Sequence, residues 1–148
     1  MLTSPDSEFQ LILAAAHRFR RAFEAGGLES ISFREFPRGA CGDASELLGE
    51  YLRDCGLGDW MYISGIESAP DGNCTHAWLE CDGIYIDITE DQFVDCDKPV
   101  VVTRSPLWEG RFSKSGGSHL AGLSYFDPES KEICRDYQCL RARADSSC

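Results

Sequence analysis

Apolar side chains near the start of the chain recur every three or four residues. Within the first 25 residues they are Phe9, Ile12, Ala16, Phe19 and Phe23. This spacing places them on one face and predicts an amphipathic helix that ends at Gly26 and Gly27. The sequence from Ser7 to Gln10 has the form of a capping box, which predicts where this helix begins. Its other face is expected to be solvated and carries Arg18, Arg20 and Arg21.

A second apolar repeat follows a short linker over residues 36–39. Its members are Ala44, Leu47, Leu48, Tyr51, Leu52 and Cys55. They predict a second helix, and Gly56, directly after the last of them, is the residue type that most often closes a helix. Cys41 is therefore expected in the first turn of this helix.

Beyond Gly58 the pattern changes to the β-branched and aromatic runs that are typical of strands. Four strands are predicted, over residues 60–66, 75–81, 84–89 and 100–104. The second and third are joined by Asp82 and Gly83, a pair that favours a two-residue hairpin turn. The remaining segments are predicted to be a long surface loop over residues 105–122, a short strand over 123–126 and a frayed tail over 145–148. His119, in the Gly-Ser part of that loop, is expected to be exposed and without a role.

These elements predict an α+β fold in which N-terminal helices pack on an antiparallel sheet and a cysteine stands at a helix N-terminus. The 148 residues are 43% hydrophobic and 11% aromatic, which is enough to form the core of one globular domain. The sequence has no internal repeat. We therefore expect a single domain over residues 1–148.

The two-residue turn also predicts how the hairpin pairs. The expected partners are Cys81 with Ile84, Trp78 with Asp87, and His76 with Thr89. One face then collects apolar side chains: Ala77, Leu79, Cys81, Ile84, Ile86 and Ile88. On the other face, His76 and Asp87 become diagonal neighbours, about 7 Å apart at the backbone and within side-chain reach. A carboxylate in that place can fix the tautomer of an imidazole and stabilise its protonated form.

Cys41 is the best candidate nucleophile among the eight cysteines. A helix N-terminus carries unpaired N–H groups and about half a positive charge, which favours a thiolate. Cys55 stands at a helix end of the opposite polarity, and Cys81 points toward the packed face of the hairpin. Cys74, just before His76, is the one plausible rival.

Small residues flank the candidate nucleophile. Gly39 and Gly42 would let a substrate backbone approach closely, and the amide of Cys41 would be one oxyanion donor. The sequence does not identify a second donor, although Gln92, shortly after Asp87, is a candidate. Trp78 is expected to form part of the core or the wall of a substrate pocket. These residues make up the candidate site for binding a substrate around the catalytic group.

The net charge of the chain excludes several classes of partner. With 25 acidic and 14 basic residues the net charge is −11, so we expect neither a nucleic acid nor an anionic membrane as a partner. No apolar run is long enough to cross a membrane, and the first nine residues lack the pattern of a secretory signal, so the expected location is cytoplasmic. The cysteines are then expected to be reduced thiols. No C-x-x-C pair is present in the sequence, and we expect no metal.

The acidic charge is concentrated around the candidate residues. Residues 41–97 contain 14 acidic side chains and one basic side chain, Arg53, a net charge of −13. The rest of the chain carries a net charge of +2. Ordinary solubility is the simplest explanation, but a field of this sign would also attract cationic peptide substrates and oppose acidic ones.

Three motifs together resemble a known superfamily. Residues 38–45 read Arg-Gly-x-Cys-x-Asp-x-Ser, residues 76–78 read His-Ala-Trp, and residues 86–89 read Ile-Asp-Ile-Thr. Their order resembles the core of the transglutaminase-like superfamily, within the papain-like cysteine hydrolase fold. The resemblance covers residues 38–93, a little over a third of the chain.

The resemblance implies a thiolate that attacks the carbonyl carbon of an amide or ester and forms an acyl-enzyme. By motif position the nucleophile is Cys41, the base is His76 and the carboxylate is Asp87. The substrate would be a protein or peptide, and the acceptor would be water in a protease or deamidase and an amine in a transglutaminase. The chain departs from the family in two ways: it is much smaller than a protein-crosslinking transglutaminase, and residues 105–108 match no part of the pattern.

Two alternatives are compatible with the same sequence. The fold could serve as a non-catalytic binding module, which a blocked groove or a Cys41 side chain turned away from His76 would favour. It could also be a small-molecule acyltransferase similar to arylamine N-acetyltransferases, which have the same order of catalytic residues. That activity needs a pocket for an acyl-donor cofactor. No sequence feature indicates such a pocket, and we expect no cofactor.

Overall fold

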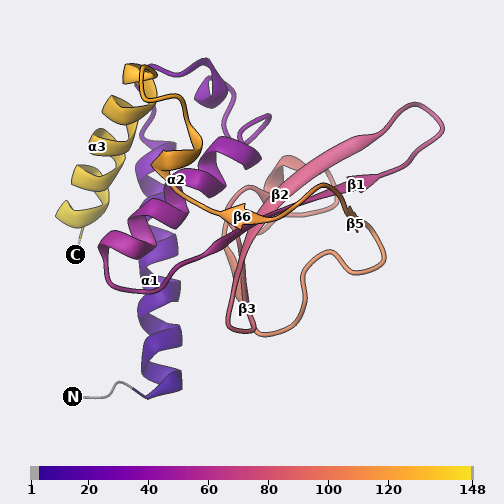
Figure 1. Ribbon diagram of the computed structural model, residues 1–148, viewed down its shortest axis with the longest axis horizontal. Coiled ribbons are helices and arrows are strands. Elements are labelled where there is room, and N and C mark those ends of the chain that lie inside the picture. The colour runs from indigo at the N-terminus through magenta and orange to yellow at the C-terminus, as the bar shows by residue number, and fades with distance from the viewer. Residues whose placement is uncertain (1–3, 148) are drawn as a thin grey trace.

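Within residues 4–147, which the computed structural model describes, three helices lie on one side of a six-stranded antiparallel sheet (Figure 1). The helices are α1 (Pro5–Glu24), α2 (Cys41–Asp54) and α3 (Lys131–Ser146). The strands are β1 (Met61–Glu67), β2 (Cys74–Cys81), β3 (Ile84–Asp87), β4 (Val101–Thr103), β5 (Ser113–Lys114) and β6 (His119–Leu120). Short 3₁₀ turns cover Ile31–Phe33, Glu90–Gln92 and Leu123–Tyr125. The predicted α+β class is confirmed.

The strands follow the order β4-β3-β2-β1-β5, and β6 also pairs with β1. β2 and β3 form the predicted hairpin, in which Cys81 stands opposite Ile84. The turn residues Asp82 and Gly83 both have positive φ, 47° and 77°, as a type I′ turn requires. The register deduced from the sequence is therefore confirmed where the two strands pair.

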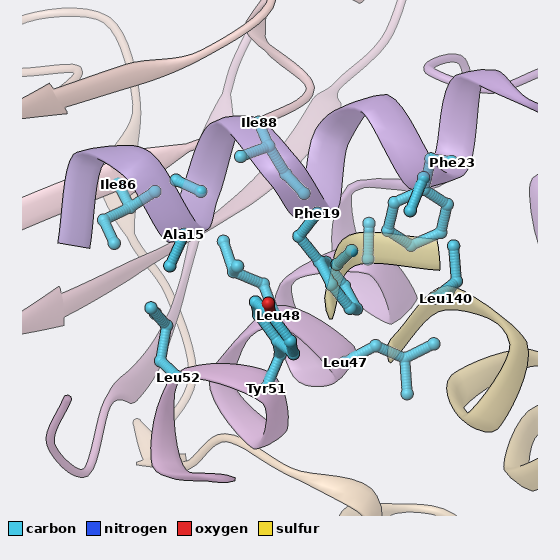
Figure 2. Close-up of a cluster of buried hydrophobic side chains, with 14 of the residues drawn as sticks. Ala15, Phe19, Phe23, Leu47, Leu48, Tyr51, Leu52, Ile86, Ile88 and Leu140 are labelled. Atoms are coloured by element: carbon cyan, nitrogen blue, oxygen red, sulfur yellow. The ribbon is translucent and has the colours of Figure 1, made fainter. Parts of the chain in front are cut away.

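The apolar face of this hairpin forms one wall of the main core. Three of its side chains pack there against the helices: Leu79, Ile86 and Ile88. Figure 2 shows Ile86 and Ile88 beside α1, with side chains of α2 below them and Leu140 of α3 at one end. Phe19 of α1 stacks on Tyr51 of α2, with ring centroids 4.8 Å apart. This packing fixes α2 against the sheet and so sets the place of Cys41 relative to the hairpin.

The start of α1 differs from the prediction, whereas the ends of α1 and α2 do not. Ser4 is the N-cap, its side chain accepts a hydrogen bond from the Ser7 amide at 3.2 Å, and Pro5 is the first helical residue. Ser7 lies inside the helix, so the predicted capping box was wrong. α1 ends just before Gly26, and Gly56 follows α2 with a φ of 73°, both as predicted.

The C-terminal third differs from the prediction in three places. Residues 131–146 form α3, which was not predicted and which includes two of the four residues of the expected frayed tail, whose last residue, Cys148, lies outside the described residues. The strand predicted over residues 123–126 is a 3₁₀ turn. The segment 105–122 is not only a surface loop, because it contains β5 and β6 and buries Phe112 and Ala121. These elements form through contacts with distant parts of the chain; the Ala121 amide, for example, donates to the Trp60 carbonyl at 2.8 Å.

Each helix is amphipathic, with one apolar face and one charged face. α1 is 20 residues long, enough to span about 30 Å, but it carries charged residues along its exposed face. None of the helices within residues 4–147 is both long and apolar enough to cross a membrane.

Candidate active site

Cys41 is the first residue of α2, as the sequence predicts. The N-cap residue, Ala40, offers no side-chain acceptor, so the N–H groups of the first turn lack a capping partner. Asp43, in the same turn, is held by a hydrogen bond from the Ser32 hydroxyl at 2.6 Å. The Cys41 side chain is partly exposed. The thiol therefore stands where a helix N-terminus favours a thiolate and where a reagent can reach it.

His76 and Asp87 meet on the face of the hairpin that points away from the helices. Both side chains are completely buried, and His76 Nε2 lies 2.5 Å from Asp87 Oδ2. The contact expected from the hairpin register is thus present. Because a carboxylate only accepts hydrogen bonds, Nε2 carries its hydrogen, and Nδ1 is left to exchange a proton with another group.

Two further residues donate hydrogen bonds to the Asp87 carboxylate. The Thr89 amide donates to Oδ1 at 2.9 Å, and the indole N–H of Trp108 donates to Oδ2 at 2.9 Å. Trp108 lies in the segment to which the sequence analysis assigned no role, and it was missed. Its φ of 63° is rare for a residue with a side chain and has a free-energy cost. The hydrogen bond to Asp87 and the packing of the indole ring offset that cost, so Trp108 is part of the site.

Two opposing influences set the pKa of His76. Burial lowers it, but the hydrogen bonds and charges of Asp87 and Cys41 outweigh burial and raise the pKa of His76 to about 9. Cys41 is thus near enough to the imidazole to raise its pKa. The structure brings the three predicted catalytic residues together in series: thiol, imidazole and carboxylate.

Other thiols have different surroundings. Burial, followed by the charge of Asp82, raises the pKa of Cys81 to about 11, so this thiol stays protonated at neutral pH. Cys74, the rival nucleophile, packs against the apolar cluster that contains Trp78. All seven cysteines within residues 4–147 are free, so they differ in environment and not in oxidation state.

Aromatic rings surround the imidazole of His76. Three ring centroids lie close to it: those of Phe93 (4.9 Å), Trp108 (5.1 Å) and Phe112 (5.6 Å). Trp78 is only 1% exposed, and its indole N–H donates to Glu80 at 3.1 Å. It belongs to the wall behind the imidazole and also lines a pocket of about 310 Å³. These rings exclude water, which strengthens the electrostatic interaction between His76 and Asp87.

Gln92 contacts the imidazole and not the nucleophile. Its side-chain amide nitrogen lies 3.2 Å from His76 Nδ1 and donates to the Thr89 carbonyl at 3.1 Å. One amide hydrogen goes to the Thr89 carbonyl, and the other can be donated to Nδ1 only when this nitrogen carries no hydrogen. Gln92 is therefore placed to orient His76, and this arrangement does not favour the oxyanion role considered from the sequence.

The two positions beside Cys41 need glycine for different structural reasons. Gly39 has a φ of 67°, which residues with a side chain rarely adopt, and nothing approaches it closely. A Cβ at Gly42 would lie 3.1 Å from the hydroxyl oxygen of Tyr62. The group that needs the space at Gly42 is thus a side chain of β1, where the sequence analysis expected a substrate backbone.

A groove of about 430 Å³ is lined in part by Gln92, the residue that contacts His76 Nδ1. Residues 35–38, which lead to α2, form one wall, and residues 91–94 form the other. Gln92 is part of the second wall, so the groove reaches the neighbourhood of His76. Val94 is fully exposed at the groove, and with Phe93 it offers an apolar surface to an extended chain.

No family model, curated protein or solved structure matches this chain. The chemistry of the site therefore has to be inferred from its own residues. Within residues 4–147, no group of three His, Cys, Asp or Glu side chains is placed to hold a metal ion. The groups that could act on a substrate are the thiol, the imidazole and the carboxylate described above.

Arg20 contacts residues on both walls of the groove, although it was predicted to lie on a solvated face of α1. That prediction was wrong: Arg20 is 5% exposed, and its guanidinium lies 4.8 Å from the centre of the Phe36 ring. It forms two hydrogen bonds with Asp91, at 2.7 and 2.8 Å, and donates to the Ile88 carbonyl at 2.8 Å. Arg20 therefore connects α1 to the turn after β3 and to the segment that precedes α2.

Arg20→Met is expected to lower the free energy of unfolding by roughly 3–5 kcal/mol, because it leaves the Asp91 carboxylate partly buried without its partner. Unfolding in guanidinium chloride, followed by circular dichroism, measures this loss. Arg21→Met is the matched control, since Arg21 is the exposed neighbour on the same helix. Its effect should stay within about 0.5 kcal/mol. Equally small effects of both variants would show that the buried ion pair does not stabilise the fold.

Proposed function

We propose that this chain is a cysteine-dependent hydrolase or acyltransferase that acts on a protein or peptide amide through a thioester. The observation that carries the proposal is the buried imidazole of His76, which has the Cys41 thiol and the Asp87 carboxylate as partners. These are the two partners that a base needs in order to activate a thiol nucleophile. The order of the motifs along the chain supports a papain-like or transglutaminase-like core as the scaffold.

In the proposed reaction, the Cys41 thiol gives its proton to His76 before the substrate binds, which leaves a thiolate beside an imidazolium, and the thiolate then attacks the carbonyl carbon. The π electrons of the carbonyl move to its oxygen and form an oxyanion, to which the Cys41 amide donates a hydrogen bond. When this intermediate collapses, the bond to the leaving amine breaks, and protonated His76 gives the amine its proton. Water or a second amine then attacks the thioester, with His76 again acting as base.

The raised pKa of His76 suits the second step. At neutral pH an imidazole with a pKa of about 9 is protonated, so its proton is available to the leaving amine. Asp87 stabilises that charge, and its hydrogen bonds to Thr89 and Trp108 keep the carboxylate oriented toward the imidazole. The buried pair therefore supports a general acid more than a strong base at rest.

The groove beside Gln92 is the proposed path of the substrate chain. Its apolar residues can bind an extended peptide next to His76, and the segment 35–38 leads directly to the nucleophile. The net charge of −13 over residues 41–97 would favour a cationic peptide over an acidic one.

Alkylation by iodoacetamide at pH 7 tests the activation of the thiol. Cys41 is expected to react fastest, by roughly tenfold over the exposed thiol of Cys55. The helix N-terminus and His76 favour the thiolate of Cys41, whereas an ordinary thiol is only a few per cent ionised at this pH. His76→Ala should remove most of this advantage. Mass spectrometry of tryptic peptides after short reaction times gives the rate at each cysteine.

Gln138→Ala, on the exposed surface of α3, is a control that should leave the alkylation pattern unchanged. Equal labelling of Cys41 and Cys55 in the wild-type protein would contradict the proposed function. So would a Cys41 rate that does not depend on His76.

A further inference from the structure

The Tyr62 side chain of β1 brings its hydroxyl to the nucleophile. Because a Cβ at Gly42 would lie 3.1 Å from this oxygen, the hydroxyl lies over the residue that follows Cys41. The charge of Cys41 also acts on the phenol: burial is the largest cause that raises the pKa of Tyr62, and the Cys41 thiolate is the next. Both observations place the hydroxyl beside the thiol.

The phenol is held in this place by stacking. His119 lies against it with ring centroids 4.6 Å apart and planes 20° apart, and Tyr125 also stacks on His119, at 4.4 Å. His119 Nε2 lies 2.7 Å from a carboxylate oxygen of Glu46, a residue of α2 that is 1% exposed. His119 was predicted to be exposed and without a role; its side chain is 31% exposed, and these contacts hold it in place. It connects the Tyr62 ring to the helix that carries the nucleophile.

The hydroxyl of Tyr62 is free to donate. Within residues 4–147 it has no hydrogen-bond partner, and the one buried side-chain polar atom without a partner in that range is Arg20 Nε. The Tyr62 oxygen thus remains in contact with solvent, where a substrate can reach it. Because its pKa is raised, the phenol keeps its proton at neutral pH.

We propose that the Tyr62 hydroxyl is the second hydrogen-bond donor of the oxyanion site, together with the Cys41 amide. The inference rests on the proposed acyl-transfer function and adds a catalytic residue that lies in none of the sequence motifs. Gln92 is not placed for this role, because its side-chain amide nitrogen lies against His76 Nδ1 and donates to the Thr89 carbonyl. The ligand of Tyr62 is the oxygen of an amide or ester carbonyl to which the thiolate has added.

The chemistry of this step needs no further reactant. The bond between the Cys41 sulfur and the carbonyl carbon forms as the carbonyl π bond breaks, and the π electron pair moves to the oxygen. Tyr62 donates a hydrogen bond to that oxygen and keeps its proton. The negative charge of the thiolate is thus transferred to the oxygen, and the total charge does not change. Alkylation by iodoacetamide differs, because the thiolate displaces iodide from a saturated carbon and no oxyanion forms.

Two reagents that react with the same thiol can therefore distinguish between the possible roles of Tyr62. Tyr62→Phe keeps the ring and removes the donor. We expect it to slow acylation by p-nitrophenyl acetate, measured as release of p-nitrophenolate, by about 10²- to 10³-fold. Alkylation of Cys41 by iodoacetamide should be unchanged. Tyr125→Phe is the matched control, because it removes the hydroxyl of an exposed ring in the same stack, and it should alter neither rate.

Gly42→Ala is a second variant that tests the same role with Tyr62 intact. Its methyl group would lie 3.1 Å from the hydroxyl and displace it, so acylation should slow while alkylation continues. Circular dichroism checks that each variant is folded. An unchanged acylation rate in Tyr62→Phe would overturn the inference alone, and so would an equal loss in both reactions. If wild-type Cys41 is not acylated at all, the proposed function fails, and the inference fails with it.

Discussion

Replacing Cys41 with alanine is expected to abolish the burst of p-nitrophenolate that the wild-type protein releases from p-nitrophenyl acetate. The burst requires a sulfur atom that can hold the acetyl group next to His76, and Cys41 is the thiol with which the imidazole interacts. Cys81 cannot replace it, because its raised pKa keeps it protonated and it packs beside the helix core. The rate should fall to that of buffer, a loss of at least about 10⁴-fold.

Cys55→Ala is the matched control for this experiment. Cys55 is exposed and caps the other end of the same helix, where the helix dipole opposes a thiolate. The burst should therefore keep its size in Cys55→Ala, and mass spectrometry of the wild-type protein should find the acetyl group on Cys41. A burst that survives in Cys41→Ala, or that disappears in Cys55→Ala, would show that the nucleophile has been assigned wrongly.

The parts of this site that could be predicted are those specified by nearby residues. The Asp82-Gly83 turn determines the pairing of the hairpin, and the two-residue period of strands then places His76 and Asp87 on one face. The place of Cys41 follows from the apolar period of α2. Each of these inferences uses fewer than about 20 consecutive residues, within which backbone geometry alone constrains which side chains meet.

The parts that could not be predicted depend on contacts between distant segments. Trp108 donates to Asp87 across 21 positions of sequence, and Arg20 binds Asp91 across 71. No local pattern reveals the partner of either residue. An arginine at this place in a helix is predicted to be solvated, and a tryptophan in a loop is predicted to be exposed. A weak signal for α3 was present, since Ile133, Tyr137, Leu140 and Ala144 are three or four residues apart, but its many charged residues obscured it.

The missed residues share a physical role. Trp108 donates to Asp87, His119 stacks on Tyr62, and Arg20 binds Asp91, and each of these contacts joins segments that are far apart in the sequence. The candidate thiol and imidazole can be recognised from local sequence, but the residues that hold the site in place come from distant segments of the chain. For this reason the site includes residues from segment 105–125 as well as residues from the motif region.

Asp87→Asn is expected to lower the rate of acylation by about 10³- to 10⁴-fold, which is the range for neutralising the carboxylate of a catalytic triad. The amide removes the negative charge that stabilises protonated His76. It also turns an NH₂ group toward the Thr89 amide or the Trp108 indole, which are themselves donors. Asp95→Asn is the control: Asp95 is an exposed carboxylate in the same part of the chain, bound to Arg111, and its loss should not change the rate.

The same variant should change how stability depends on pH. The pKa of His76 is raised from 6.5 to about 9 in the folded protein, so its proton stabilises the fold fully below pH 6.5 and this contribution is lost as the pH rises through 9. The difference corresponds to roughly 3 kcal/mol. From pH 6 to pH 10, wild type should therefore lose more unfolding free energy than Asp87→Asn, in which the pKa of His76 should fall. Denaturant unfolding at the two pH values measures the loss, and an NMR titration of the His76 ring gives its pKa directly. A ring that titrates at the same pH in both proteins would mean that Asp87 neither raises the pKa of His76 nor stabilises the imidazolium on which the proposed general acid depends.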